Sequence, residues 1–212
     1  MRRGRRLGRA FFARDALTVA PDLLHKVLVH DDPAGPLAVR IVEVEAYGGA
    51  DDPGSHGFRG PTPRTASMFG PPGHLYVYFT YGMHWCVNVV TGAPGAASAV
   101  LLRAGIPVDG IEVMRSRRVA ARRDRDLTSG PAKLAQALGL SGVHDGIDLT
   151  RGPVRVVDDG MAPPDEVCWT PRIGLAPGKG DTQPWRCTVP GVPEPRRAAR
   201  ARTSRSAPER RR

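Results

Sequence analysis

The 212-residue sequence lacks the features that mark membrane-spanning, secreted and metal-dependent proteins. It has no apolar run of about eighteen residues, and no apolar segment follows the arginines of residues 1–6, so we expect neither a spanning helix nor a secretory signal. Its three cysteines, Cys86, Cys168 and Cys187, form no C-x-x-C pair, which argues against disulfides and a structural zinc site. No histidine lies in an H-E-x-x-H or H-x-E arrangement. We therefore expect a soluble, cytoplasmic protein without a metal or a cofactor.

Acidic residues are fewer than basic ones, and the formal net charge is +10. Such an excess usually indicates an acidic partner such as nucleic acid. However, residues 1–9 hold five arginines and no acid, and residues 194–212 hold eight arginines and two acids, so the remainder is close to neutral. We predict disordered basic arms at residues 1–12 and 193–212, flanking one domain at residues 13–192. The arms either bind a polyanion loosely or only solvate the chain.

Apolar segments and turn signals alternate along the predicted domain. The predicted strands are residues 27–29, 37–45, 75–80, 85–90, 99–103, 154–157, 172–175 and 186–189. The predicted helices are residues 21–26, residues 107–123, and one capped by Ser129 with Pro131 in its first turn and Gly139 at its end. The pattern predicts an α+β fold with a mostly antiparallel sheet.

Two carboxylates lie on the predicted strand 37–45. Glu43, Glu45 and the following Tyr47 share one face if the strand stays regular to its end. Periodicity alone favours a solvated face. The alternative is a pocket, because the strand leads into residues 48–73, and a loop this long in a compact domain is usually functional. Apolar surroundings or a neighbouring acid would then make one carboxylate a better general base.

Aromatic residues make up only 6% of the chain, yet three of its four tyrosines lie in residues 75–83. Sheet packing is the usual reason for such clustering. Tyr81, however, precedes Gly82 at a predicted hairpin turn, where an exposed aromatic ring could wedge into DNA or stack on a base. Asn88 and Arg103 interrupt neighbouring apolar strands, so each is either a structural tie or a pocket group.

These residues resemble a known family, the alkyladenine (3-methyladenine) DNA glycosylases of the mammalian alkylpurine type, which also occur in bacteria. The similarity spans about residues 13–190. The motifs that carry it are IVEVEAY at 41–47, SHGFRG at 55–60, TPR at 62–64, MF at 68–69, GHLYVY at 73–78, YGM at 81–83, VLLRA at 100–104 and SGPAKL at 129–134. The resemblance implies a single compact domain around a curved antiparallel sheet with flanking helices.

The resemblance also implies which residues carry out the reaction. Glu45 would be the general base that activates water, and Arg103 would help to hold Glu45 and the water. No lysine near the motifs is required as a Schiff-base nucleophile, so we expect a monofunctional enzyme that leaves an abasic site uncut. Cys187 departs from the family, because an aromatic residue commonly follows the arginine matched by Arg186. His84 and Trp85 follow the YGM motif, at positions for which the resemblance implies no fixed residue type.

The remaining implied roles concern DNA. The residues expected to bind the flipped base are Tyr47, His56 and Tyr78 as walls, and Asn88 as the floor that penalises normal purines. Those expected to intercalate are Tyr81 and Met83, and those expected to meet phosphates are Thr62, Arg64 and Lys133. The implied partner is double-stranded DNA containing damaged purines, bound by a monomer at the nucleoid. Which lesion is preferred stays open, as do two alternatives: a non-catalytic nucleic-acid-binding protein and a hydrolase of free nucleosides.

Overall fold

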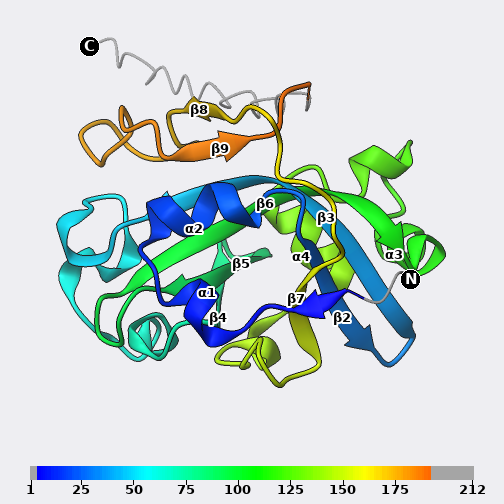
Figure 1. Cartoon of the computed structure of the whole chain (residues 1–212), viewed down its shortest axis with the longest axis horizontal. Coiled ribbons are helices and arrows are strands. Elements are labelled where there is room, and N and C mark those ends of the chain that lie inside the picture. The colour runs from blue at the N-terminus through cyan, green and yellow to red at the C-terminus, as the bar shows by residue number, and fades with distance from the viewer. Residues whose placement is uncertain (1–3, 192–212) are drawn as a thin grey trace, which may run out of the picture.

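An extended antiparallel sheet forms the centre of the computed structural model, which describes residues 4–191 (Figure 1). Its strands, in spatial order, are β1 (Arg5–Arg6), β7 (Val154–Asp158), β2 (Val27–Asp32), β3 (Gly35–Tyr47), β6 (Ser98–Asp109), β5 (His84–Thr91) and β4 (Leu75–Thr80). Two short strands, β8 (Cys168–Thr170) and β9 (Arg186–Thr188), join it through β3. The predicted α+β class with an antiparallel sheet is confirmed.

The central strand β3 carries Glu45, the candidate general base. Along one side it pairs with β6, and along the other it pairs first with β2 and then with β9. Its register against β6 shifts between Ile41 and Glu43 and again between Glu43 and Val44. Such bulges bend a strand and redirect its side chains. The β9 pairing covers residues 43–45, so the chain's later part lies directly beside the two carboxylates.

Short helices cover the sheet. They are α1 (Arg9–Phe12), α2 (Ala16–Leu23), α3 (Ile111–Arg117) and α4 (Pro131–Leu138), with 3-10 turns η1 (Gly49–Asp51), η2 (His56–Arg59), η3 (Ala66–Phe69), η4 (Asp124–Asp126) and η5 (Gly142–His144). The helix α2 packs against β3 and β6, and α4 packs against β5 and β6. Among the described residues no helix has the length and apolar character needed to cross a membrane.

Alternation along the strands separates the main core from the candidate site. Leu75, Val77 and Val89 belong to the large core formed with α2 and α4. Tyr76 and Val90, one position along, belong to a smaller cluster with Met68, Ala97 and Ala99, against which Tyr47 and Tyr78 pack. Because successive side chains of a strand point to opposite faces, the second cluster supports the face of the sheet that holds the site.

Residues 5–12 of the predicted N-terminal arm pack against the domain. The strand β1 pairs with β7, and both Leu7 and Phe12 are buried in the main core. Arg9 is paired with Asp148, so part of the arm's charge is neutralised on the domain. Two apolar residues among the arginines are therefore enough to anchor residues 5–12. The predicted tail at residues 193–212 lies outside the described residues.

The predicted helix at residues 107–123 is wrong at both ends, and only Ile111–Arg117 is helical. Backbone pairing of β6 with β3 continues to Asp109, where sheet hydrogen bonds replace the helical ones that we expected. Gly110, at a φ of 71°, then separates the strand from the short helix α3. The positive φ of this residue makes a turn that favours glycine.

Three further predictions need correction. The predicted helix at residues 21–26 lies earlier, because Asp15 accepts the backbone N–H of Thr18 and begins α2 at Ala16. Gly130, not Ser129, precedes the first turn of α4. The predicted strand at residues 172–175 is an irregular segment, whose polar groups bind side chains instead of a neighbouring strand.

Candidate active site

Glu45 lies at the centre of a buried polar network near the end of β3. Its side chain is fully buried, so a solvated face for this carboxylate is wrong. Oε1 accepts the backbone N–H of Ile173 at 2.7 Å and lies 3.1 Å from Nη1 of Arg103. Oε2 accepts the hydroxyl of Tyr47 at 2.9 Å. Three elements of the sequence therefore meet at one carboxylate: the end of β3, β6 and the segment after β8.

A second carboxylate and a second arginine complete the network. Oε1 of Glu43 accepts Nε of Arg103 at 2.8 Å and Nε of Arg186 at 2.7 Å. All four side chains are buried, and their formal charges cancel. Burial works against the charged form of Arg103, but Glu45 and Glu43 outweigh it and raise the pKa of Arg103 above its ordinary value. Arg103 is thus held as a cation by one carboxylate on each side of its guanidinium.

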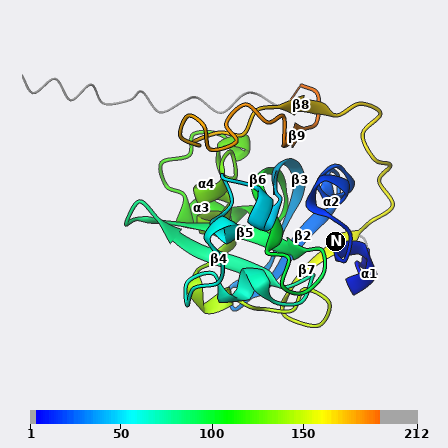
Figure 2. The same cartoon turned by 90° about the vertical axis from the view of Figure 1, so that its left-hand side faces the viewer.

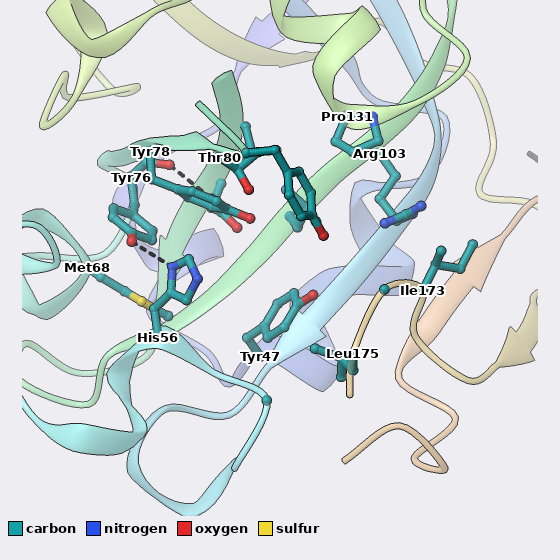
Figure 3. A pocket seen from close by; sticks show the side chains of 16 residues that line it. Tyr47, His56, Met68, Tyr76, Tyr78, Thr80, Arg103, Pro131, Ile173 and Leu175 are labelled. Atoms are coloured by element: carbon teal, nitrogen blue, oxygen red, sulfur yellow. Dashed lines mark hydrogen bonds between the residues drawn. The ribbon is translucent and has the colours of Figure 1, made fainter. Parts of the chain in front are cut away.

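A cavity of about 220 Å³ opens beside this network (Figure 3). Tyr47, His56 and Tyr78 point into it from three different segments, and Arg103, which contacts Glu45, also lines it. The ring of His56 lies 4.5 Å from that of Tyr78, edge to face. The predicted walls are therefore brought together by the fold. A cavity with aromatic walls and a guanidinium at one end suits a flat heteroaromatic ring.

The protonation states of the walls are fixed by burial. Burial, aided by the charge of Arg64, lowers the pKa of His56, so its ring is neutral at neutral pH. Its Nδ1 lies 2.8 Å from the hydroxyl of Tyr76, whose pKa burial raises to about 12. Burial and, next, the charge of Glu45 raise the pKa of Tyr47 well above its ordinary value. Tyr47 therefore stays protonated and can donate to Glu45.

Asn88 is both a structural tie between strands and a residue of the pocket. Its Nδ2 donates to the backbone carbonyl of Tyr76 at 3.0 Å, which ties β5 to β4. The same residue lines the cavity with Leu101 and Cys86. Because the amide nitrogen is held by the backbone, the orientation of the Asn88 side chain in the cavity is set. The predicted position at the pocket is therefore reached, while its effect on normal purines stays a prediction.

Tyr81 and Met83 form the tip of the β4–β5 hairpin, which projects from the body of the molecule (Figure 2). Their side chains are 81% and 66% exposed, although both are large and apolar. Tyr81 and Gly82 have φ values of 52° and 66°, and the N–H of Met83 bonds the carbonyl of Thr80, as in a type I′ turn. A tyrosine in this conformation costs about 1–2 kcal/mol. The turn thus presents an exposed ring at the cavity mouth, at a cost in stability.

The three residues expected to meet phosphates are exposed. Nη2 of Arg64 donates to the carbonyl of Phe79, beside the hairpin, and Thr62 is bonded to Thr65 at the start of the same loop. Lys133 lies in the first turn of α4, two residues after Pro131, which lines the cavity. These groups lie on segments near the mouth, as a phosphate-contacting role requires. Contact with DNA itself stays a prediction.

Comparisons with known proteins agree with this geometry. A family model described as methylpurine-DNA glycosylase matches residues 10–193. The chain belongs to the methylpurine-DNA glycosylase family. It is 56% identical over 185 residues to a protein of Burkholderia cenocepacia, covering 86% of this chain and 87% of that protein. It is 52% identical over 190 residues to a protein of Streptomyces avermitilis, covering 88% and 89%.

Both relatives are named 3-methyladenine DNA glycosylases. The resemblance drawn from the sequence motifs is therefore confirmed, as is the predicted enzyme class, a DNA glycosylase hydrolase with DNA as its partner. Within residues 4–191 no group of three or more His, Cys, Asp or Glu side chains could hold a metal ion.

Several site residues of this glycosylase were not predicted from the sequence. Arg186 binds Glu43, and the backbone of Ile173 binds Glu45. Arg172 and Asp52 form a buried ion pair beside Tyr47. For the two arginines the available signal was a polar residue inside a short apolar segment. This signal does not show which carboxylate each arginine will contact.

Proposed function

We propose that this protein is a monofunctional DNA glycosylase of base excision repair, which flips an alkylated or deaminated purine into the cavity and hydrolyses its N-glycosidic bond with water activated by Glu45. One observation carries this proposal: a fully buried carboxylate, paired with Arg103, lies beside a cavity with aromatic walls. Glu45 has three contacts, and a carboxylate can accept about four hydrogen bonds, so it can also hold a water.

A single carboxylate is sufficient for an alkylated purine. A purine methylated on a ring nitrogen carries positive charge and leaves readily, unlike the sugar oxygen in ordinary glycoside hydrolysis, which needs a second carboxyl as acid. Aromatic walls favour such a cation by about 1–2 kcal/mol when it is desolvated. Neither Glu43 nor another carboxylate needs to act as the acid, and Glu43 is occupied by two arginines.

Extrusion of the base costs a few kcal/mol, and less for a damaged pair. Stacking on Tyr47 and Tyr78, at about 1–3 kcal/mol per base, offsets much of this cost. Tyr81 can fill the gap left in the duplex, because its ring is exposed at the hairpin tip beside the cavity. Thr62, Arg64 and Lys133 would then hold the phosphates, and Met83 would flank the wedge.

The test is base release from duplexes that contain methylated purine, hypoxanthine or ethenoadenine. We expect release by the wild-type protein, near-complete loss in Glu45→Gln with DNA binding retained, and no strand cut without alkali or heat. A nucleoside hydrolase would keep its activity in Tyr81→Ala, whereas the proposed enzyme would lose it. Binding of DNA without release of any of these bases by the wild-type protein would contradict the proposal.

A further inference from the structure

Arg172 and Asp52 form the most deeply buried ion pair of residues 4–191, with side chains 0% and 1% exposed. We propose that this pair is a positioning clamp, which holds the backbone N–H of Ile173 and the ring of Tyr47 against Glu45. The proposal rests on the proposed function, in which Glu45 activates the water. Neither residue touches the cavity, so both would act through others.

The pair joins two segments that are far apart in the sequence, residues 46–54 and the segment after β8. Nη1 and Nη2 of Arg172 lie 2.5 and 2.7 Å from the two oxygens of Asp52, a bidentate contact. Asp52 also accepts the backbone N–H groups of Gly48 and Gly54, which fixes the loop after β3. Nη1 of Arg172 donates to the carbonyl of Ala46 at 3.0 Å, on β3 itself.

Through its neighbours the clamp supports two of the three contacts of Glu45. Ile173, which donates to Glu45, directly follows Arg172. The guanidinium of Arg172 lies 4.6 Å from the ring centre of Tyr47, which also donates to Glu45, and 4.9 Å from that of Trp185. The third contact, with Arg103, is supported separately by Glu43.

Stability alone does not account for this arrangement. Burial favours the neutral form of Asp52, but hydrogen bonds from Arg172 and from the backbone of Gly48 outweigh it and lower the pKa of Asp52. The pair is therefore charged, and buried charged pairs are often no more stabilising than apolar residues of the same size. Nε of Arg172 is also buried without a hydrogen-bond partner. The ion pair instead fixes the positions of the groups that contact Glu45.

Gly54 shows how tightly the clamped segment lies against the loop. A Cβ on Gly54 would come within 2.6 Å of the carbonyl of Lys179, 2.8 Å of Cδ1 of Leu175 and 2.9 Å of Nη2 of Arg172. Gly54→Ala would therefore push the segment away from the loop without removing any charge. It gives a second perturbation of the same contact, and because Gly54 and Leu175 also line the cavity, exchange at the Ile173 amide is its decisive readout.

The experiment compares Asp52→Asn and Gly54→Ala with a control, Asp159→Asn. Asp159 forms a similar pair with Arg40, which also donates to a backbone carbonyl, and both side chains are 15% exposed. Base release is measured in single turnover per folded molecule, together with DNA affinity, Tm and hydrogen exchange at the Ile173 amide. A misplacement of about 1 Å can cost about 100-fold in rate. We expect losses of about 10-fold or more for the two clamp variants, with DNA affinity within about 3-fold of wild type.

We also expect faster exchange at Ile173 in both clamp variants, and neither effect in Asp159→Asn even if its Tm falls. A wild-type single-turnover rate and wild-type Ile173 exchange in Asp52→Asn and Gly54→Ala, with only Tm reduced, would refute the clamp. Hydrogen exchange at the Ile173 amide can be measured whether or not the protein releases a base. Absence of base release by the wild-type protein, with Ile173 exchange still dependent on Asp52, would instead overturn the proposed function and leave the clamp supported.

Discussion

Glu43 neutralises two buried arginines with one carboxylate oxygen, so Glu43→Gln removes a charge while keeping the size of the side chain. The buried network then contains Arg103, Arg186 and Glu45 and carries a net positive charge. A glutamine oxygen can still accept from one Nε, but its attraction for a cation is weaker. The variant therefore tests both the stability of the network and the electrostatic field at the cavity.

The size of the effect follows from the burial of the network. Removing one partner of a buried ion pair costs about 3–5 kcal/mol, which for a protein of this size lowers Tm by about 6–20 °C. The uncompensated charge also repels a cationic base. At about 8 Å and an effective dielectric constant of about 20, one unit charge is worth about 2 kcal/mol, or about 30-fold in binding.

The assay is single-turnover base release from two duplexes, one with a cationic lesion such as a methylated purine and one with a neutral lesion such as ethenoadenine. We expect Glu43→Gln to lose about 30-fold more activity on the cationic lesion than on the neutral one. Glu112→Gln is the matched control, because Glu112 pairs with Arg115 at the surface and its side chain is 82% exposed. Exposed pairs contribute about 0–1 kcal/mol, so this control should behave as wild type.

Equal losses on the two lesions would refute the electrostatic part of this reasoning, because a structural defect does not distinguish the charge of the base. A Tm within about 2 °C of wild type would refute the other part, since a buried unpaired guanidinium must cost more than that.

Three further predictions concern the wall of the cavity, the basic residues near its mouth, and the stability of the protein at low pH. Tyr47→Phe keeps the ring but removes its bond to Glu45, so we expect unchanged DNA affinity and about a 10-fold or greater loss of single-turnover rate. Arg64→Ala and Lys133→Ala should each weaken DNA binding at all sequences and reduce the salt slope of log K by about 1, as measured by titration. Hydrogen bonds from Thr150 and Arg9 outweigh burial and lower the pKa of Asp148 to about 2, so its stabilisation is present above about pH 4 and lost as the pH falls towards 2. Unfolding curves of Asp148→Asn and wild type should therefore differ at pH 5 and converge near pH 2.

Much of the sheet could be predicted because strand signals are local. Residues 75–80 and 85–90 are apolar runs separated by a turn, and the structure pairs them as β4 and β5. The first part of the helix predicted at residues 107–123 is wrong because a helix-compatible composition cannot show that Asp109 pairs with β3. Residues 5–12 of the predicted arm pack against the domain because Leu7 and Phe12 fill the core, which the charge of this segment does not show. In both cases a tertiary contact decided the outcome.

The candidate site was predicted in part for the same reason. Motifs lie within single segments, so Glu45, Tyr47, His56 and Tyr78 could be identified from the sequence, and the structure brings them to one cavity and its adjoining network. The partners that hold these residues lie far along the chain. Arg186 is 143 residues from Glu43, a separation at which no spacing rule applies.

Residues 168–191 supply the distant partners that local motifs did not identify. Of its two strands, β8 is mainly exposed, so this region adds little to the core apart from β9. It nevertheless supplies Arg186 to Glu43, and Arg172 and Ile173 to Asp52 and Glu45. The earlier part of the domain supplies the aromatic walls, but one side of the cavity, lined by Ile173, Gly174 and Leu175, is completed only when the end of the domain folds against β3. The same step completes the charge balance and the geometry of Glu45.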